Sequence, residues 1–138
     1  MAATSTEKIS RAKHPAGGYV LAIEWTWKAH TDGAVTSAVS RLTGNHRIQG
    51  FLIGLKTQDG GTNPSGGYTA TVSDEDSHSP ITVTGTVGTT TYVAAPTVTA
   101  PVPWIDTAYL DLTVASAGDG GQGVTTLYIW SFYDLAAA

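Results

Sequence analysis

Hydrophobic and polar residues alternate most regularly between residues 17 and 28, around two tryptophans. Read with a period of two, one set of side chains is large and apolar, and it consists of Tyr19, Leu21, Ile23, Trp25 and Trp27. The side chains between them are smaller or polar. This alternation predicts a β-strand with a heavy apolar face in a core and a lighter face that touches water.

A turn signal at Asp32-Gly33 follows this strand, and a stretch rich in Val, Thr and Ser comes next, from residue 34 to 42. Glycine readily adopts the positive φ that a tight strand-to-strand turn needs. We therefore expect residues 18–42 to form a hairpin that is the nucleus of an all-β domain.

Short apolar stretches recur along the rest of the chain. They cover residues 47–58, 68–73, 81–87, 89–94, 108–114 and 124–133. The two stretches around Gly88 are equally consistent with one strand and a loop, and residues 59–67 form a polar loop. The last stretch is apolar on both faces, which is typical of a central strand or of a strand at a subunit contact. Seven or eight strands with no long helical period predict one all-β domain over residues 17–138, an antiparallel, jelly-roll-like β-sandwich.

Residues 1–16 show no such periodicity, and Gly17-Gly18 marks their end. They carry the basic residues Lys8, Arg11 and Lys13. We expect this segment to be a flexible basic N-terminal arm that becomes ordered only against a partner.

Charge is sparse and unevenly distributed along the 138 residues. Asp, Glu, Lys and Arg make up 13% of the chain, against about 25% in typical soluble domains. All seven basic residues lie within the first 56 positions beside three acids (7 − 3 = +4), and the remaining residues hold eight acids and no base (−8). At this charge density chance alone can produce such asymmetry, but it is also typical of proteins that pack against an acidic surface or against copies of themselves.

Membrane and nucleic-acid partners are disfavoured. No apolar run approaches the roughly 18 residues of a membrane span, and the net charge of −4 argues against nucleic acid as the main partner. The first residues lack the apolar middle of a secretion signal, so we expect a protein that is made and assembled in a cytoplasm.

Residues 77–105 contain no Asp, Glu, Lys or Arg, and the part from 95 to 103 is rich in Pro and unsuited to a sheet interior. One small sandwich is unable to bury all the apolar residues of this segment. We expect the segment and the aromatic row at 128–132 to form an apolar contact with a second copy or another protein. The residues predicted to carry the partner interface are Lys8, Arg11, Lys13, Tyr92, Trp104, Tyr128, Trp130 and Phe132.

Motifs for catalysis or metal binding are weak. Residues 118–123 match G-x-G-x-x-G, but a strand follows where a dinucleotide site needs a helix, so we interpret them as a hairpin turn. Residues 74–76 offer carboxylates without the Gly and Glu that an EF-hand loop needs, and an acidic strand end is the simpler interpretation; whether they bind a cation stays open. The four His are isolated, Cys is absent and no nucleophile elbow occurs. We therefore predict no catalytic residues, no metal site, no cofactor and no enzymatic activity.

Several short motifs occur in an order that resembles small β-rich virion proteins of tailed bacteriophages. The motifs are Trp25-Thr26-Trp27 before Asp32-Gly33, then Ile48-Gln49-Gly50, then Pro64 and residues 67–76, and finally residues 110–114 before the glycine turn. The resemblance covers roughly residues 25–133. Where such proteins often continue the acidic turn with Gly and Asp, this chain has Ser77-His78-Ser79, so no role at that corner is carried over.

The resemblance implies a head decoration (cement) protein that binds the outside of the major capsid protein shell and bridges neighbouring subunits. It also implies a homo-oligomer, a dimer or trimer, located on the virion capsid surface after assembly in the host cytoplasm. A tail, neck or fibre-attachment subunit is the alternative within this class. A carbohydrate-binding or glycan-active β-sandwich is the alternative from another class, and an exposed row of Trp and Tyr beside a pair of carboxylates would favour it.

Overall fold

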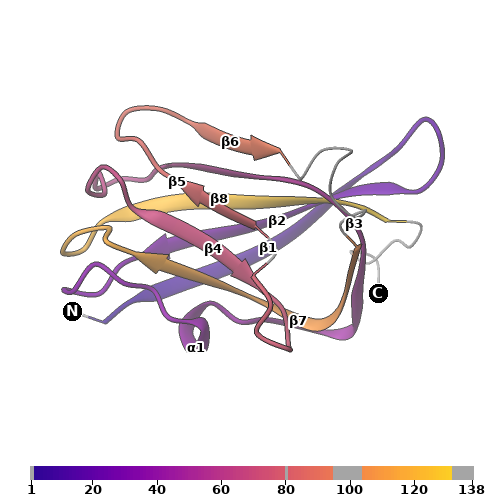
Figure 1. The fold of residues 1–138 in the computed structure, drawn as a ribbon, viewed down its shortest axis with the longest axis horizontal. Coiled ribbons are helices and arrows are strands. Elements are labelled where there is room, and N and C mark those ends of the chain that lie inside the picture. The colour runs from indigo at the N-terminus through magenta and orange to yellow at the C-terminus, as the bar shows by residue number, and fades with distance from the viewer. Residues whose placement is uncertain (1, 80, 95–103, 132–138) are drawn as a thin grey trace.

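Strands make up almost all of the regular structure in the computed structural model, which describes residues 2–79, 81–94 and 104–131 and their side chains, except those of 38–39 and 43–47 (Figure 1). The strands are β1 (Thr4–Lys13), β2 (Tyr19–Lys28), β3 (Leu42–Asp59), β4 (Thr69–Ser73), β5 (Ile81–Thr84), β6 (Thr91–Ala94), β7 (Trp104–Ala115) and β8 (Gln122–Ser131). One helical turn, α1 (Ser37–Ser40), precedes β3. In the described part, nothing helical is long and apolar enough to cross a lipid bilayer. The all-β class predicted from the sequence is confirmed.

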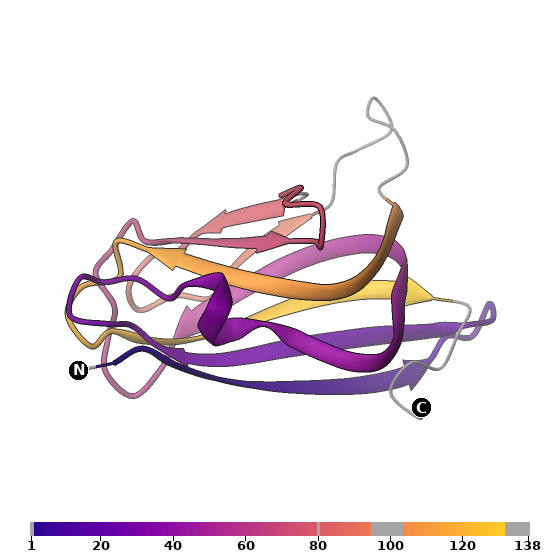
Figure 2. The ribbon, with the colours of Figure 1, turned by 90° about the horizontal axis from the view of Figure 1, so that it is seen from below.

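The strands pair antiparallel in the order β1-β2-β8-β3-β7-β4-β5, with β6 beside β3. The two longest strands change partners along their length. β3 pairs with β7 through residues 42–51 and with β8 through residues 51–59. β7 in turn pairs with β4 through residues 111–115. The sheet therefore bends over on itself into two layers, with β1, β2 and β8 in one layer and β4 and β5 in the other (Figure 2).

The core lies between the two layers, and β2 contributes its largest side chains. Leu21, Ile23 and Trp25 are fully buried, and Trp27 is 2% exposed. The strands around them add Leu55, Ala70, Val72, Val83, Leu110, Leu112, Val114, Leu127 and Ile129, all with no exposed surface. The core face predicted for this strand is confirmed, except that Tyr19 is only partly buried at its end.

The hairpin predicted for residues 18–42 is wrong, although the chain does turn at Gly33, where φ is 82°. β2 pairs with β1 and β8, and the segment after the turn crosses to the other layer. Ser40 fixes this crossing, because its carbonyl oxygen accepts a hydrogen bond from Trp25 Nε1 (2.8 Å) and its hydroxyl oxygen accepts one from the backbone N–H of Leu112 (2.9 Å). A short run of Val, Thr and Ser suits a strand and a crossing connection alike, so the pattern did not distinguish them.

The flexible arm predicted for residues 1–16 is also wrong, because residues 4–13 form β1 and pair with β2 along its whole length. These two strands are the real hairpin, turned by glycines at 17 and 18 with φ of 107° and 70°. Among the β1 residues that face the core side of β2, Ile9 is the only apolar one. An edge strand with so little apolar content shows no hydrophobic alternation, which explains why the sequence pattern missed it.

The glycine run at 118–123 links the layers and is not the predicted hairpin turn. It joins β7 to β8, and β3 lies between these two strands in the sheet. Gly118 and Gly120 take φ of 79° and 66°, which only glycine adopts without strain. The two strands predicted on either side of Gly88 are confirmed as β5 and β6.

Candidate interaction surface

Aromatic side chains of β8 lie on the outer face of its layer, because they alternate with the residues that enter the core. Trp130 faces Val20 of β2, and Tyr128 faces Ala22. Both aromatic residues are partly exposed, whereas their neighbours in the chain are buried. The last strand is therefore central, which is one of the two alternatives that its apolar faces predicted, and its aromatic row faces outward.

Phe51 of β3 joins this row because it faces two tryptophans at once. It pairs with Trp130 on one side and with Trp104 of β7 on the other. The ring centroids of Phe51 and Trp130 are 5.6 Å apart with planes at 30°, and those of Phe51 and Trp104 are 5.1 Å apart at 75°. Ring pairs in this range attract each other beyond simple burial. Three strands thus form one aromatic strip.

A second pair of rings lies beside this strip. Tyr92 of β6 pairs with Lys56 of β3, and its ring centroid is 6.4 Å from that of Tyr128. Gly54 makes room for the Tyr92 ring, since a Cβ at that position would lie 2.3 Å from the Tyr92 hydroxyl oxygen. We call the outer surface formed by these rings the aromatic face; its members are Phe51, Tyr92, Trp104, Tyr128 and Trp130.

Two members of the aromatic face are about half exposed, Tyr92 at 50% and Trp104 at 48%. With Val87 at 42%, they are the large apolar residues that protrude from the described part of the chain. All three come from the segment without charged residues. The same segment also places Ile81 and Val83 in the core, so the expectation that it forms a contact as a whole is wrong. Its Pro-rich part lies outside the described residues.

A shallow hollow of about 420 Å³ opens in the aromatic face. It is lined by Val20, Ile53, Lys56, Tyr92 and Tyr128. Lys56 Nζ lies 5.7 Å from the centre of the Tyr128 ring, within the range of a cation–π contact. The hollow offers apolar walls and a positive charge, which suits an apolar side chain with an acidic neighbour.

The three basic residues predicted at the interface do not form one patch. Lys8 faces Glu24 and lies on the same side of the sheet as the aromatic face. Arg11 and Lys13 face the core-side residues of β2 and so point to the opposite side of β1. All three side chains are exposed. Phe132, also predicted at the interface, lies outside the described residues.

Phe51 is the aromatic residue that the sequence analysis missed. A signal for it exists in residues 50–54, where apolar side chains follow one another and break the alternation. The register of β3 against β8 shifts at this point, between Leu52 and Gly54. Phe51 and Ile53 share the outer side by ordinary alternation. The irregularity re-aims the residues that follow, so that Gly54 also lies opposite the outward Tyr128.

The turn between β1 and β2 holds Trp130 in place, which the sequence analysis also missed. Trp130 Nε1 donates a hydrogen bond to the carbonyl oxygen of Gly17 at 3.1 Å. The His14 ring meets the indole edge-on, with centroids 6.3 Å apart. The outermost end of the aromatic strip is therefore fixed by a turn that is distant in sequence.

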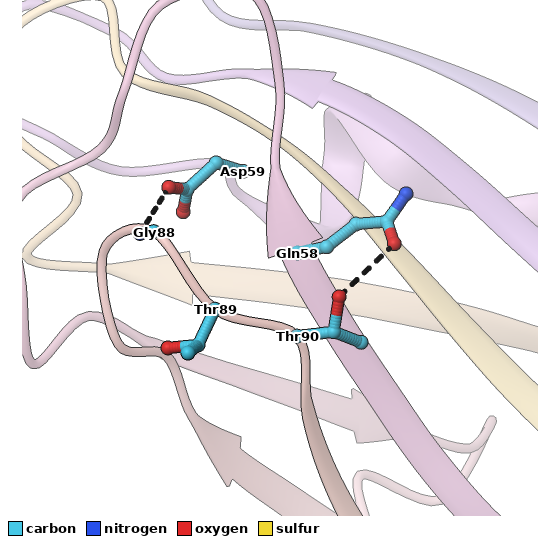
Figure 3. Close-up of a pocket in the computed structure, with 5 residues that line it drawn as sticks. All are labelled: Gln58, Asp59, Gly88, Thr89 and Thr90. Atoms are coloured by element: carbon cyan, nitrogen blue, oxygen red, sulfur yellow. Dashed lines mark hydrogen bonds between the residues drawn. The ribbon is translucent and has the colours of Figure 1, made fainter.

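A second hollow, of about 320 Å³, lies where β3 ends (Figure 3). Asp59 Oδ2 accepts a hydrogen bond from the backbone N–H of Gly88 at 2.6 Å, and the Thr90 hydroxyl donates to Gln58 Oε1 at 3.5 Å. Among the described residues that line it, Asp59 is the only ionisable one. The carboxylate holds the turn at 86–90, and no second acid or base among the described residues lines the hollow for proton transfer.

The acidic corner at 74–76 uses its first carboxylate to build a turn. Asp74 Oδ1 accepts hydrogen bonds from the backbone N–H groups of Asp76 (3.0 Å) and His78 (2.9 Å). Among the described residues, no three His, Asp or Glu side chains converge as a metal-ligand set. These contacts fit the interpretation of this corner as an acidic strand end.

Arg41, which directly follows α1, forms an ion pair with Asp111 of β7, and this pair has a structural role. Asp111 is 5% exposed, and both its oxygens accept bonds from the Arg41 guanidinium, at 3.0 Å from Nε and 3.3 Å from Nη2. These bonds raise the pKa of Arg41. The guanidinium also lies 4.1 Å from the centre of the Tyr109 ring. The carboxylate is thus neutralised where it is buried and is not presented to a substrate.

Comparisons with known proteins give no family for this chain. No family model and no curated protein matches it. Among solved structures it is similar to the arabinose-bound α-L-arabinofuranosidase MgGH51, with 12% identity and a TM-score of 0.32. The similarity covers 94% of this chain and 23% of that enzyme, so the chain spans less than a quarter of the enzyme's length. At this level the likeness carries no argument about function.

Proposed function

We propose that this chain is a non-enzymatic structural protein of a tailed-phage virion, a head decoration protein that binds the outside of the major capsid shell and bridges its subunits. The observation that carries the proposal is the aromatic face, which gathers five rings from four strands on one outer surface. The motif order that resembles phage virion proteins supports the choice of partner.

The chemistry of the aromatic face supports a protein partner. Desolvated interface cores are poor in charge and enriched in aromatic residues. Trp and Tyr also dominate the small set of residues that carry most binding energy, and Trp104 and Tyr92 are the most exposed rings on this face. Lys56 and Lys8 lie on the same side of the sheet as the aromatic face. An acidic surface of the capsid protein would therefore complement the charge on this side.

Trp104→Asp tests this proposal, because it places a charge on the most exposed tryptophan of the aromatic face without touching the core. Purified protein is mixed with expanded phage shells and sedimented with them. We expect binding to weaken at least about 30-fold, since loss of an interface Trp that carries binding energy costs about 2 kcal/mol or more. Circular dichroism and melting should match wild type, because the side chain is 48% exposed.

Val87→Asp is the matched control, since it adds the same charge at another protruding apolar residue that is not a member of the aromatic face. It should bind shells like wild type. Shell binding that survives Trp104→Asp would contradict the proposal. Wild-type protein that binds purified tails and ignores shells would instead assign it to the tail, neck or fibre attachment.

One observation favours a second candidate, a carbohydrate-binding module: the rings lie on an open sheet face, where sugars stack. The tilts between the rings, 75° for Phe51 and Trp104 and 56° for Tyr92 and Tyr128, do not form one flat platform, which is why it ranks second. Affinity electrophoresis through soluble polysaccharides distinguishes the two. Retardation that Trp104→Asp abolishes would favour the carbohydrate module.

A further inference from the structure

β1 leaves one whole side of its backbone without a strand partner among the described residues. It is first in the sheet order and pairs with β2 alone, from Thr4 opposite Lys28 to Lys13 opposite Tyr19. An edge strand of ten residues is a ready template for another extended chain. The other described edge strands, β5 and β6, have four residues each and are much poorer templates.

Two of the usual protections of a sheet edge, a Pro and a β-bulge, are missing from β1, although α1 contacts this strand. Its sequence has no Pro between residues 4 and 13. Its pairing with β2 runs through consecutive residues, without a bulge in this fully described stretch. Its charged residues protect the edge against an incoming strand of like charge, but both signs occur among them, so a strand with complementary charges can still pair.

The charges on one side of β1 are placed symmetrically about Ile9. Glu7 lies two residues before it and Arg11 two residues after it, and all three point to the core side of the sheet. When two β1 strands lie antiparallel with Ile9 opposite Ile9, Glu7 of each copy lies opposite Arg11 of the other. Facing residues on neighbouring antiparallel strands are close enough for opposite charges to attract and like charges to repel.

Other registers lose this match. A shift by one residue would place core-side residues of one copy opposite outer residues of the other. A shift by two residues puts Ile9 opposite Glu7 in one direction and opposite Arg11 in the other. In the first of these shifts, Lys8 also meets Lys8.

We propose that two copies of this chain pair antiparallel through β1, about a two-fold axis at Ile9, and so form one continuous sheet. Burial raises the pKa of the Glu7 carboxyl, which indicates that its own chain compensates its charge incompletely. Arg11 of the second copy brings a compensating charge. The dimer is independent of the virion role, because the aromatic face is built from β3, β6, β7 and β8.

A charge exchange tests the pairing. Light scattering of the wild-type protein should give twice the mass of one chain. Glu7→Arg and Arg11→Glu should each raise the dissociation constant at least about tenfold, because like charges then face each other. The double variant should restore the dimer. Residues four apart on a strand are about 13 Å from each other, so a contact within one chain does not explain such rescue.

Cross-linking tests the register. The natural chain has no Cys, and facing residues on antiparallel strands are close enough for a disulfide. Ile9→Cys should therefore form a disulfide-linked dimer under oxidation, whereas Ser5→Cys, which would face Lys13 of the other copy, should not. The proposal is overturned by a single-chain mass at every concentration, by a dimer that ignores the charge reversals, or by Ile9→Cys that stays unlinked. Melting curves of all variants show whether the monomer remains folded.

Discussion

At the scale of single residues, a buried chain of hydrogen bonds links the two layers through the core. Trp27 Nε1 donates to the hydroxyl oxygen of Thr125 at 2.9 Å. The hydroxyl oxygens of Thr125 and Thr57 are 2.9 Å apart, and so are those of Thr57 and Tyr68. All four side chains are at most 2% exposed. Because a buried polar group without a partner is costly, each member depends on the next.

Tyr68→Phe removes one end of this chain and should lower the free energy of unfolding by about 1–2 kcal/mol near neutral pH. Burial raises the pKa of Tyr68 above its ordinary value. The extra free energy of unfolding that Tyr68 gives the wild type is therefore fully present below a pH of about 10, the pKa of tyrosine in the unfolded chain. It is lost as the pH rises through the higher pKa of Tyr68 in the folded protein. Urea unfolding at increasing pH should show the two proteins converging. Tyr92→Phe, at an exposed ring, is the control that should change little.

Trp25→Ala tests the core assignment of β2. Trp25 is fully buried and its indole N–H bonds to Ser40, so its removal leaves both a cavity and an unpaired carbonyl oxygen. We expect a loss of about 3–5 kcal/mol in the free energy of unfolding, measured in urea. Trp104→Ala is the matched control and should cost far less. A Trp25→Ala protein that is as stable as wild type would refute the packing.

At the scale of elements, β1 determines how the first sixteen residues behave. Its outward residues are polar except Ala12, and Ile9 packs against the edge of the core. Its backbone completes the hydrogen bonding of β2, whose core side holds the largest buried side chains. The strand is therefore part of the folded domain, and its basic residues are distributed over both sides of the sheet.

Deletion of residues 2–13 tests this role, and it should lower the melting temperature clearly. The deletion exposes the backbone edge of β2 to water and uncovers part of the core, and burial of apolar surface is the main stabilising term. Deletion of residues 2–3 alone, which precede the strand, is the control. An unchanged melting temperature without residues 2–13 would restore the idea of a dispensable arm.

At the scale of the whole molecule, the bent sheet separates two surfaces. The aromatic face lies outside β3, β6, β7 and β8, whereas the open edge belongs to β1. A subunit with two separate contacts can bind a partner and a second copy at once. This arrangement suits the proposed bridging of capsid subunits.

The two contacts should be separable by mutation. Trp104→Asp should lose shell binding and keep the dimer mass, whereas Glu7→Arg should lose the dimer and, at saturating protein, still bind shells. Sedimentation with shells and light scattering of the free protein measure the two properties. One substitution that abolishes both properties in a folded protein would show that the surfaces are coupled.

The sequence by itself determined the fold class and the composition of the core. The alternation from Tyr19 to Trp27 sets one apolar face, and a period of two has few outcomes other than a half-buried strand. It also indicated that the last strand is central or at a subunit contact, and it offered Tyr92 and Trp104 as interface residues, which the structure places outside the core. Local periodicity suffices for these features because each depends on which side of its own strand a residue occupies.

Tertiary structure alone decided which strands are neighbours. The pairing of Phe51 with both Trp104 and Trp130, the crossing after Gly33 and the assignment of Glu7 and Arg11 to one edge all depend on partners far away in sequence. Strand pairing is a choice among many non-local contacts of similar local pattern, so register and order follow from how the whole core packs. The aromatic face exists only because the bent sheet brings four strands together.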